Sequence, residues 1–307
     1  MTTHSCSRRL QPARSWQPGR RAPACIFSRA AIVGVGLIGG SIGMALRRRR
    51  LACEVVGFAR RKETLDAAES LGAIDRRAAS APEAVMGADL VVLATPVEAI
   101  LARMSEIAPH LSHGALVTDV GSTKRRIVAA ASRLPKWVDF IGGHPMAGSE
   151  KTGVSSARPD MFQGATWIIT PTDRARPAAI RKLRRLVVAL GARPLSVPPI
   201  LHDRLVAAVS HLPHIAAVAL VAVAAQLAAQ EPKVWQVAAS GFRDATRLAS
   251  GDPSVWRDIC LTNKSALRAS IRALRTQLGA WEAALARSDP GEIEALLARA
   301  KKVRDSL

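Results

Sequence analysis

The 307-residue sequence lacks several features that define particular protein classes. Its 4 cysteines lie far apart and form no CxxC pair, so we expect neither a disulfide framework nor a structural zinc site. No apolar run reaches 18 residues. The longest, residues 215–225, has 11, which favours a buried helix over a membrane span.

Acidic residues are absent before Glu54, whereas ten arginines occur there. This segment carries half of the formal net charge of +20. No nucleic-acid recognition motif accompanies the charge, so we expect no nucleic-acid partner and no membrane partner. Residues 1–28 are predicted to be a disordered basic tail. Their composition also resembles an organellar transit peptide, and an upstream start codon would produce a similar tail. The expected location is cytoplasmic.

Alternating strand and helix patterns predict an α/β fold over residues 29–199. Apolar runs predict strands at residues 30–35, 54–58, 90–94, 115–119, 139–142, 167–170 and 193–197. Helical patterns between them cover residues 41–50, 62–71, 97–108, 123–134 and 178–190. This alternation predicts a parallel sheet with crossover helices, a Rossmann-type dinucleotide-binding domain. Strand patterns end near residue 199, so residues 200–307 are predicted to form an all-α domain.

A glycine-rich loop follows the first predicted strand. Gly34, Gly36 and Gly39 form a GxGxxG motif between a strand and a helix, which predicts a dinucleotide site. The first glycine would permit a tight turn, the second would let the pyrophosphate approach the backbone, and the third would let helix and strand pack closely. Leu37 and Ile38 complete the loop, which we expect to contact the cofactor phosphates at the helix N-terminus.

The end of the second predicted strand favours NADP+ over NAD+. Ala59 stands where a carboxylate would bind the ribose of NAD+, and Arg60 and Arg61 follow it, suited to a 2′-phosphate. The alternative is a solvated basic helix start. Glu54 lies at the start of this strand, so we expect it to be too far from the strand's end to bind the ribose. The other predicted cofactor contacts follow later strands and are Thr95, Pro96 and Gly121.

Two further segments end neighbouring strands and carry candidate catalytic groups. His144 stands in a glycine-rich stretch that we expect to be a loop, and its ordinary pKa near about 6.5 suits a general base. Ser122 could donate to that imidazole or orient it. A Ser–His nucleophile pair is the alternative, but a dehydrogenase needs only a group that takes the hydroxyl proton as hydride leaves.

Taken together, the motifs resemble those of the prephenate and arogenate dehydrogenase family. They are GVGLIGGSIG, VTDVGSTK, GGHPMAGSE, the pair His202-Asp203, SHLPH at residues 210–214, and GFRDATRLASGDPSVW at residues 241–256. The resemblance runs from about residue 30 to the C-terminus. It implies oxidative decarboxylation of prephenate with NAD(P)+ in tyrosine biosynthesis, with arogenate as the alternative substrate. Another NADP-dependent two-domain reductase is a further alternative.

The resemblance also implies roles for individual residues. His144 would deprotonate the substrate hydroxyl, Ser122 would help to align His144 and the nicotinamide, and Arg247 would bind a substrate carboxylate. The implied pocket positions are His214, Trp256, Ser210 and Glu150. His202 could equally be a helix-start feature, and His211 could merely cap or pack. No metal site is expected.

The helical domain is expected to form a homodimer. The apolar run of residues 215–225 exceeds what a helix with one face in water should show, and the resemblance points to a dimer through this domain. A bundle within one chain is the alternative.

Overall fold

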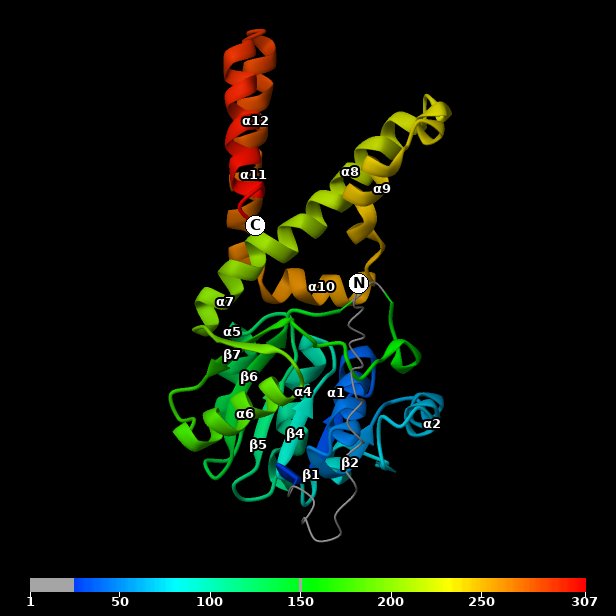
Figure 1. Ribbon diagram of the computed structural model, residues 1–307, viewed down its shortest axis with the longest axis vertical. Helices are drawn as coiled ribbons and strands as arrows, with labels where there is room; N and C mark the ends of the chain where they lie inside the picture. Colours follow the sequence, from blue (N-terminus) through cyan, green and yellow to red (C-terminus); the bar gives the residue numbers. More distant parts are fainter. Residues whose placement is uncertain (1–24, 149–150) are drawn as a thin grey trace, which may run out of the picture.

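The structure, a computed structural model, describes residues 25–148 and 151–307. An eight-stranded sheet with its covering helices forms the base of the molecule, and the C-terminal helices project from it as two arms (Figure 1). Two sequence predictions, on residues 1–24 of the basic tail and on Glu150, fall outside the described residues.

The sheet has the order β3-β2-β1-β4-β5-β6-β7-β8. Its strands are β1 (Phe27–Val33), β2 (Ala52–Phe58), β3 (Arg76–Arg77), β4 (Leu90–Leu93), β5 (Leu116–Asp119), β6 (Asp139–Pro145), β7 (Thr166–Pro171) and β8 (Arg193–Ser196). The central order 3-2-1-4-5-6 is that of a doubly wound Rossmann sheet. The N-terminal α/β fold predicted from the sequence is therefore confirmed.

One strand corrects the expectation of a fully parallel sheet. β6 and β7 pair antiparallel, with His144 opposite Ile168, while all other neighbouring strands are parallel. Parallel neighbours need a crossover connection, usually a helix. Between β6 and β7 the described chain contains only the short 3-10 turn η3 (Val154–Ser156). The chain therefore turns back beside β6 instead of crossing the sheet.

Helices cover both faces of the sheet. They are α1 (Leu37–Arg48), α2 (Lys62–Ser70), α3 (Ala81–Val85), α4 (Val97–Ile107), α5 (Arg125–Ala130) and α6 (Pro177–Ala189). Buried side chains of α1, α2 and α6 form one core against the sheet, and those of α3, α4 and α5 form a second core on the opposite face. This arrangement leaves the carboxyl edge of the parallel strands open to the helical domain.

Several element boundaries differ from those predicted. β1 begins at Phe27, so residues 27 and 28 belong to the sheet and not to the predicted tail. α1 begins at Leu37, four residues before the predicted start, because the helix starts within the glycine loop. The short elements β3 and α3 were not predicted, since two and five residues are too few to show a period.

The second part of the chain is helical, as predicted. Its helices are α7 (Pro199–Val206), α8 (Leu212–Ala228), α9 (Ser240–Thr246), α10 (Pro253–Thr262), α11 (Lys264–Ala286) and α12 (Pro290–Arg304). α7, the π-helical turn η4 (Ala207–His211) and α8 form one continuous helix. α11 and α12 pack as a hairpin, and this hairpin and α8 project as the two arms in Figure 1.

The continuous helix of residues 199–228 is the one described segment whose length and apolar character would allow it to cross a membrane. Its most apolar window has a mean hydropathy of 2.0 and is 28% buried. The apolar run of residues 215–225 is thus not buried within one chain: Ala217 is its one buried residue. The alternative of a bundle within one chain does not cover it.

Candidate active site

The glycine loop between β1 and α1 has the geometry that a dinucleotide requires. Gly34 has φ +106°, a conformation that favours glycine, and a Cβ there would lie 2.6 Å from the Ala94 carbonyl oxygen. A Cβ on Gly39 would lie 2.1 Å from the Gly34 oxygen, so this glycine lets helix and loop pack. A Cβ on Gly36 would meet nothing within 4 Å. This open side leaves room for a pyrophosphate beside the backbone at the N-terminus of α1.

The residues after β2 line a hollow beside this loop. Ala59, Arg60, Arg61 and Thr64 surround a space of about 440 Å³. Both arginines are exposed, and α2 begins directly after Arg61. Two guanidinium groups and a helix N-terminus make this hollow suited to an anionic group. Glu54 lies at the start of β2, bonded to Arg29, and so away from the hollow, as predicted.

The other predicted cofactor contacts follow β4 and β5 at the same edge of the sheet. The Thr95 hydroxyl is buried and has no hydrogen-bond partner, and Pro96 beside it is exposed. An unpartnered buried hydroxyl suits a ligand group. Gly121 is buried, and its N–H donates to Asp119 Oδ2 at 2.8 Å. Leu37 and Ile38 are half-buried at the start of α1. Together these residues fit a dinucleotide lying along the edge.

His144 lies in β6 and not in the loop that the sequence predicted. The strand extends through Pro145 because His144 and its neighbours pair with β7, and the side chain is 8% exposed. Burial is the main reason why the pKa of His144 lies well below its ordinary value, and His202, Lys124 and His211 lower it further. The imidazole is therefore neutral near pH 7, the form that accepts a proton.

A buried ion pair fixes the two segments that carry the candidate catalytic residues. Lys124 Nζ bonds Asp119, and neither side chain is exposed. Asp119 Oδ1 also accepts from the Gly143 N–H at 3.1 Å, which ties the end of β5 to β6 one residue before His144. Removing a charged pair from water costs free energy, and additional hydrogen bonds such as this one offset that cost. The pair sets the position of the base.

Ser122 is half-buried beside this pair. It follows β5, next to Gly121, but within the described residues it makes no hydrogen bond to His144. Its alignment role stays a prediction.

Four of the predicted substrate residues lie in the helical domain: Ser210, His214, Arg247 and Trp256. The His214 ring stacks on Trp256 at a centroid distance of 3.5 Å, and the His214 side chain is 5% exposed. α8, which carries His214, packs against η6 (Arg247–Ser250), the 3-10 turn that begins at Arg247. Arg247 is exposed, and Ser210 is half-buried in the π-helical turn. Glu150 cannot be placed, because it lies outside the described residues.

Comparison with known proteins gives the family. A family model described as prephenate dehydrogenase, nucleotide-binding domain, matches residues 42–196, and one described as prephenate dehydrogenase, dimerization domain, matches residues 198–299. The chain belongs to the prephenate dehydrogenase family. This confirms the resemblance drawn from its motifs and makes it an oxidoreductase family member with a nucleotide-binding and a helical domain.

Three similar proteins carry informative names. A prephenate dehydrogenase of Bacillus subtilis is 41% identical over 235 residues, 76% of this chain, and the match spans 63% of that protein's length. The crystal structure of prephenate dehydrogenase from A. aeolicus, in complex with hydroxyphenyl propionate and NAD+, has a TM-score of 0.85 at 32% identity and covers 91% of this chain and 98% of its own. The crystal structure of Synechocystis arogenate dehydrogenase has a TM-score of 0.77, also at 32% identity, and the match covers 91% of this chain and 99% of that chain.

Four residues to which the sequence assigned no role in the site join it: His202, Asp203, His211 and Asn263. His202 contacts His144, with its Nε2 2.9 Å from His144 Nδ1, and Asp203 contacts His202. His211 is 1% exposed, accepts from the Asn263 amide at 3.1 Å and approaches Trp256 edge-on. In the sequence, the pairing of His202 with Asp203 was the one indication that His202 has a role in the site, and a helix start would explain the same pair. Asn263 belongs to no motif, so nothing pointed to it.

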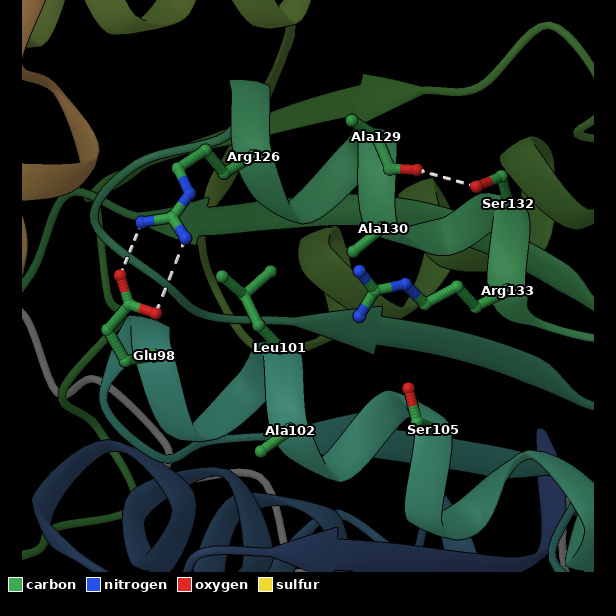
Figure 2. Close-up of a pocket in the computed structure, with 9 residues that line it drawn as sticks. All are labelled: Glu98, Leu101, Ala102, Ser105, Arg126, Ala129, Ala130, Ser132 and Arg133. Atoms are coloured by element: carbon green, nitrogen blue, oxygen red, sulfur yellow. Dashed lines mark hydrogen bonds and ion pairs between the residues drawn. The ribbon is translucent and has the colours of Figure 1, made fainter.

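A larger hollow does not belong to this site. This hollow, of about 590 Å³, lies between α4 and the segment formed by α5 and the 3-10 turn η2 (Ala131–Arg133). Figure 2 shows the residues that line it, with the Glu98–Arg126 ion pair at one end. Small and polar side chains line most of it, and none of the predicted site residues does. It opens on the outer side of two helices that cover the sheet, so the chemistry is assigned to the carboxyl edge.

Proposed function

We propose that the chain is a prephenate dehydrogenase that oxidatively decarboxylates prephenate to 4-hydroxyphenylpyruvate, using NAD(P)+ as hydride acceptor. The observation that carries the proposal is His144: a buried, neutral imidazole at the same sheet edge as a glycine loop that fits a dinucleotide. The family of the chain and the printed name of its Bacillus relative support the same reaction.

The chemistry follows from the position of the proton acceptor. The bound nicotinamide supplies the acceptor for the hydride that leaves C4 of the ring. His144 takes the proton of the C4 hydroxyl as the carbonyl forms. The ring carboxylate then departs as carbon dioxide, its bonding electrons make the ring aromatic, and His144 returns the proton to the phenolate oxygen. Because its pKa is low, the imidazolium gives this proton back readily.

The substrate carboxylates are assigned to the helical domain. Arg247 offers a rigid fork of donors that suits a carboxylate, and the stacked pair His214 and Trp256 presents a flat, half-apolar wall to the ring. Ser210 completes the proposed pocket, and the role of Glu150 stays a prediction from the sequence. Arogenate is the second candidate, since the Synechocystis arogenate dehydrogenase is as similar in sequence as the A. aeolicus prephenate dehydrogenase.

The cofactor preference is proposed to be NADP+ over NAD+. Arg60 and Arg61 line the hollow at the end of β2, and Ala59 leaves it without a carboxylate. A 2′-phosphate on the ribose would meet two guanidinium groups there. The A. aeolicus structure contains NAD+, so the test must include both cofactors.

The working unit is proposed to be a homodimer in the cytoplasm. The matched model of residues 198–299 is described as a dimerization domain. Apolar side chains on both arms are exposed in the single chain, among them Val223 (69%), Leu285 (62%) and Val303 (63%). Exposed apolar residues in this number mark an interface.

The decisive experiment measures initial rates of nicotinamide reduction with prephenate and arogenate, each with NAD+ and NADP+. We expect the highest kcat/KM with prephenate and NADP+. Turnover of arogenate alone would favour the second candidate. Without turnover in any of the four combinations, in a protein shown to be folded, the reaction is wrong and another two-domain reductase is the next candidate.

Arg60→Ala and Arg61→Ala test the cofactor assignment. We expect each to raise KM for NADP+ by about 10-fold, the effect of losing one charge-assisted hydrogen bond, and to leave KM for NAD+ unchanged. Arg48→Ala is the control, because it removes an equal charge from the exposed C-terminal end of α1. Equal losses with both cofactors would contradict a 2′-phosphate site.

A further inference from the structure

Three buried side chains form a hydrogen-bonded row that ends at the proposed base. His144 Nδ1 lies 2.9 Å from His202 Nε2, and His202 Nδ1 lies 2.8 Å from Asp203 Oδ1. Their exposed fractions are 8%, 0% and 4%. The row crosses from β6 of the nucleotide-binding domain to α7 of the helical domain. Its donors and acceptors can be assigned from the Asp203 end.

Asp203 fixes the direction of the row. Its Oδ1 accepts from the Lys124 N–H at 2.7 Å, and its Oδ2 accepts from the Arg125 N–H at 3.0 Å. Both oxygens act as acceptors, which is the bonding pattern of an ionised carboxylate. His202 Nδ1 must therefore carry a hydrogen and donate it to Asp203.

The tautomer of His144 follows from this. Burial lowers the pKa of His202, so its imidazole is neutral and holds only one N–H. With that hydrogen on Nδ1, His202 Nε2 is an acceptor. His144 then donates its own Nδ1–H to it, and the His144 lone pair is on Nε2. Nε2 is the one ring nitrogen left to meet a substrate hydroxyl.

We propose that His202 and Asp203 are positioning residues that hold His144 in the tautomer with a basic Nε2. This rests on the proposed function, in which His144 is the base. His202 is fully buried and acts through His144: it keeps the proton of His144 on the inner nitrogen and fixes the plane of the ring. When His144 takes up a proton, its Nδ1–H still has an acceptor, and the Asp203 carboxylate stands behind that acceptor to balance the new charge.

Other titratable groups face this row, but none of them hydrogen-bonds the His144 ring as His202 does. Lys124 and Asp119 pack against it from the end of β5, and His211 from η4. Lys124 Nζ is held by Asp119, and His211 Nδ1 by Asn263. Among the described residues, only His202 hydrogen-bonds the His144 ring.

Two variants separate a hydrogen-bonding role from a packing role. In His202→Gln the amide oxygen stands near the position of Nε2 and accepts from His144, so we expect kcat within about 5-fold of the wild type. His202→Leu fills the same space without an acceptor. There we expect kcat to fall about 100-fold, the lower range of what a positioned general base contributes, with KM for prephenate nearly unchanged. Leucine retaining as much activity as glutamine would overturn the proposal.

A second readout needs no substrate. In protein labelled with ¹⁵N-histidine, two-bond ¹H–¹⁵N spectra report which ring nitrogen carries hydrogen. His144→Asn assigns the His144 signals, and His110→Gln, at an exposed position, is the control for loss of one histidine. We expect Nδ1–H in the wild type and in His202→Gln, and a mixture of tautomers in His202→Leu. Nε2–H in the wild type would overturn the tautomer assignment even if the enzyme turns over. Absence of turnover would refute the proposed function and leave this measurement intact.

Discussion

At the scale of single residues, base and substrate anchor should affect different kinetic constants. His144→Asn removes the proton acceptor, so we expect kcat to fall by about 100-fold or more with a small change in KM. Arg247→Gln removes a charged donor from the proposed carboxylate site, so KM should rise by about 10- to 100-fold with kcat largely kept. Steady-state kinetics with prephenate measures both. Arg48→Gln controls for the lost charge, and unchanged kcat/KM in both variants would place the site elsewhere.

The low pKa of His144 predicts an unusual pH profile. Burial keeps the imidazole neutral down to a pH well below 6.5, so kcat should stay level as pH falls from 8 to 6.5 and decline only in more acidic solution. An ordinary histidine base would already lose half of its activity near about pH 6.5. The measurement is kcat with saturating prephenate across this range. A midpoint at 6.5 would mean that the base is a solvent-exposed group.

The same histidines make folding sensitive to acid. Burial lowers the pKa of His144, His202 and His211, the last to about 4. Below about pH 6.5 the unfolded chain binds protons that the folded chain does not, so stability is full above 6.5 and is lost as pH falls. Each histidine contributes a slope of about 1.4 kcal/mol per pH unit in that window. Urea unfolding at pH 7.5 and 5.5 measures the loss and shows where the activity profile remains interpretable.

At the scale of elements, substitutions in the glycine loop should have two different effects: one should lower the stability of the fold and the other the affinity for the cofactor. Gly39→Ala would place a Cβ 2.1 Å from the Gly34 oxygen, so α1 cannot pack and the free energy of unfolding should drop by about 2 kcal/mol or more. Gly36→Ala meets open space, so the fold should be kept while the dissociation constant of the dinucleotide rises at least 10-fold. Urea unfolding and a cofactor titration on both variants check this. Unchanged cofactor affinity in Gly36→Ala would place the pyrophosphate elsewhere.

The sequence predicts long periodic elements far better than contacts between them. Apolar strands and the glycine motif carry local signals, so the doubly wound sheet could be predicted from the residues alone. The reversal of β7 could not, because strand direction depends on what the chain does between Pro145 and Thr166 and not on the strand itself. The same holds for the site. His144 belongs to a local motif and could be predicted, whereas its hydrogen bond to His202 joins residues that are 58 apart in the chain. A residue pattern holds no sign of such a contact.

At the scale of the whole molecule, dimerisation and catalysis should be coupled through one helix. The continuous helix of residues 199–228 holds His202, His211 and His214 at its buried end and exposes apolar side chains at the other. If a second subunit packs on that exposed end, it holds the helix in place. The histidines of the substrate pocket at the other end of the helix are then held in place as well. A variant that separates the subunits should therefore also weaken substrate binding.

Val223→Glu tests this coupling. The side chain is 69% exposed in α8, so a charge there should not disturb the single chain but should oppose apolar contact with a partner. Light scattering should give twice the 32.6 kDa chain mass for the wild type and a single chain mass for the variant, with KM for prephenate raised several-fold. Val188→Glu, 59% exposed on α6, adds the same charge outside the helical domain and should remain a fully active dimer. A wild-type monomer with full activity would show that the pocket needs no partner and that the exposed apolar arms serve another purpose.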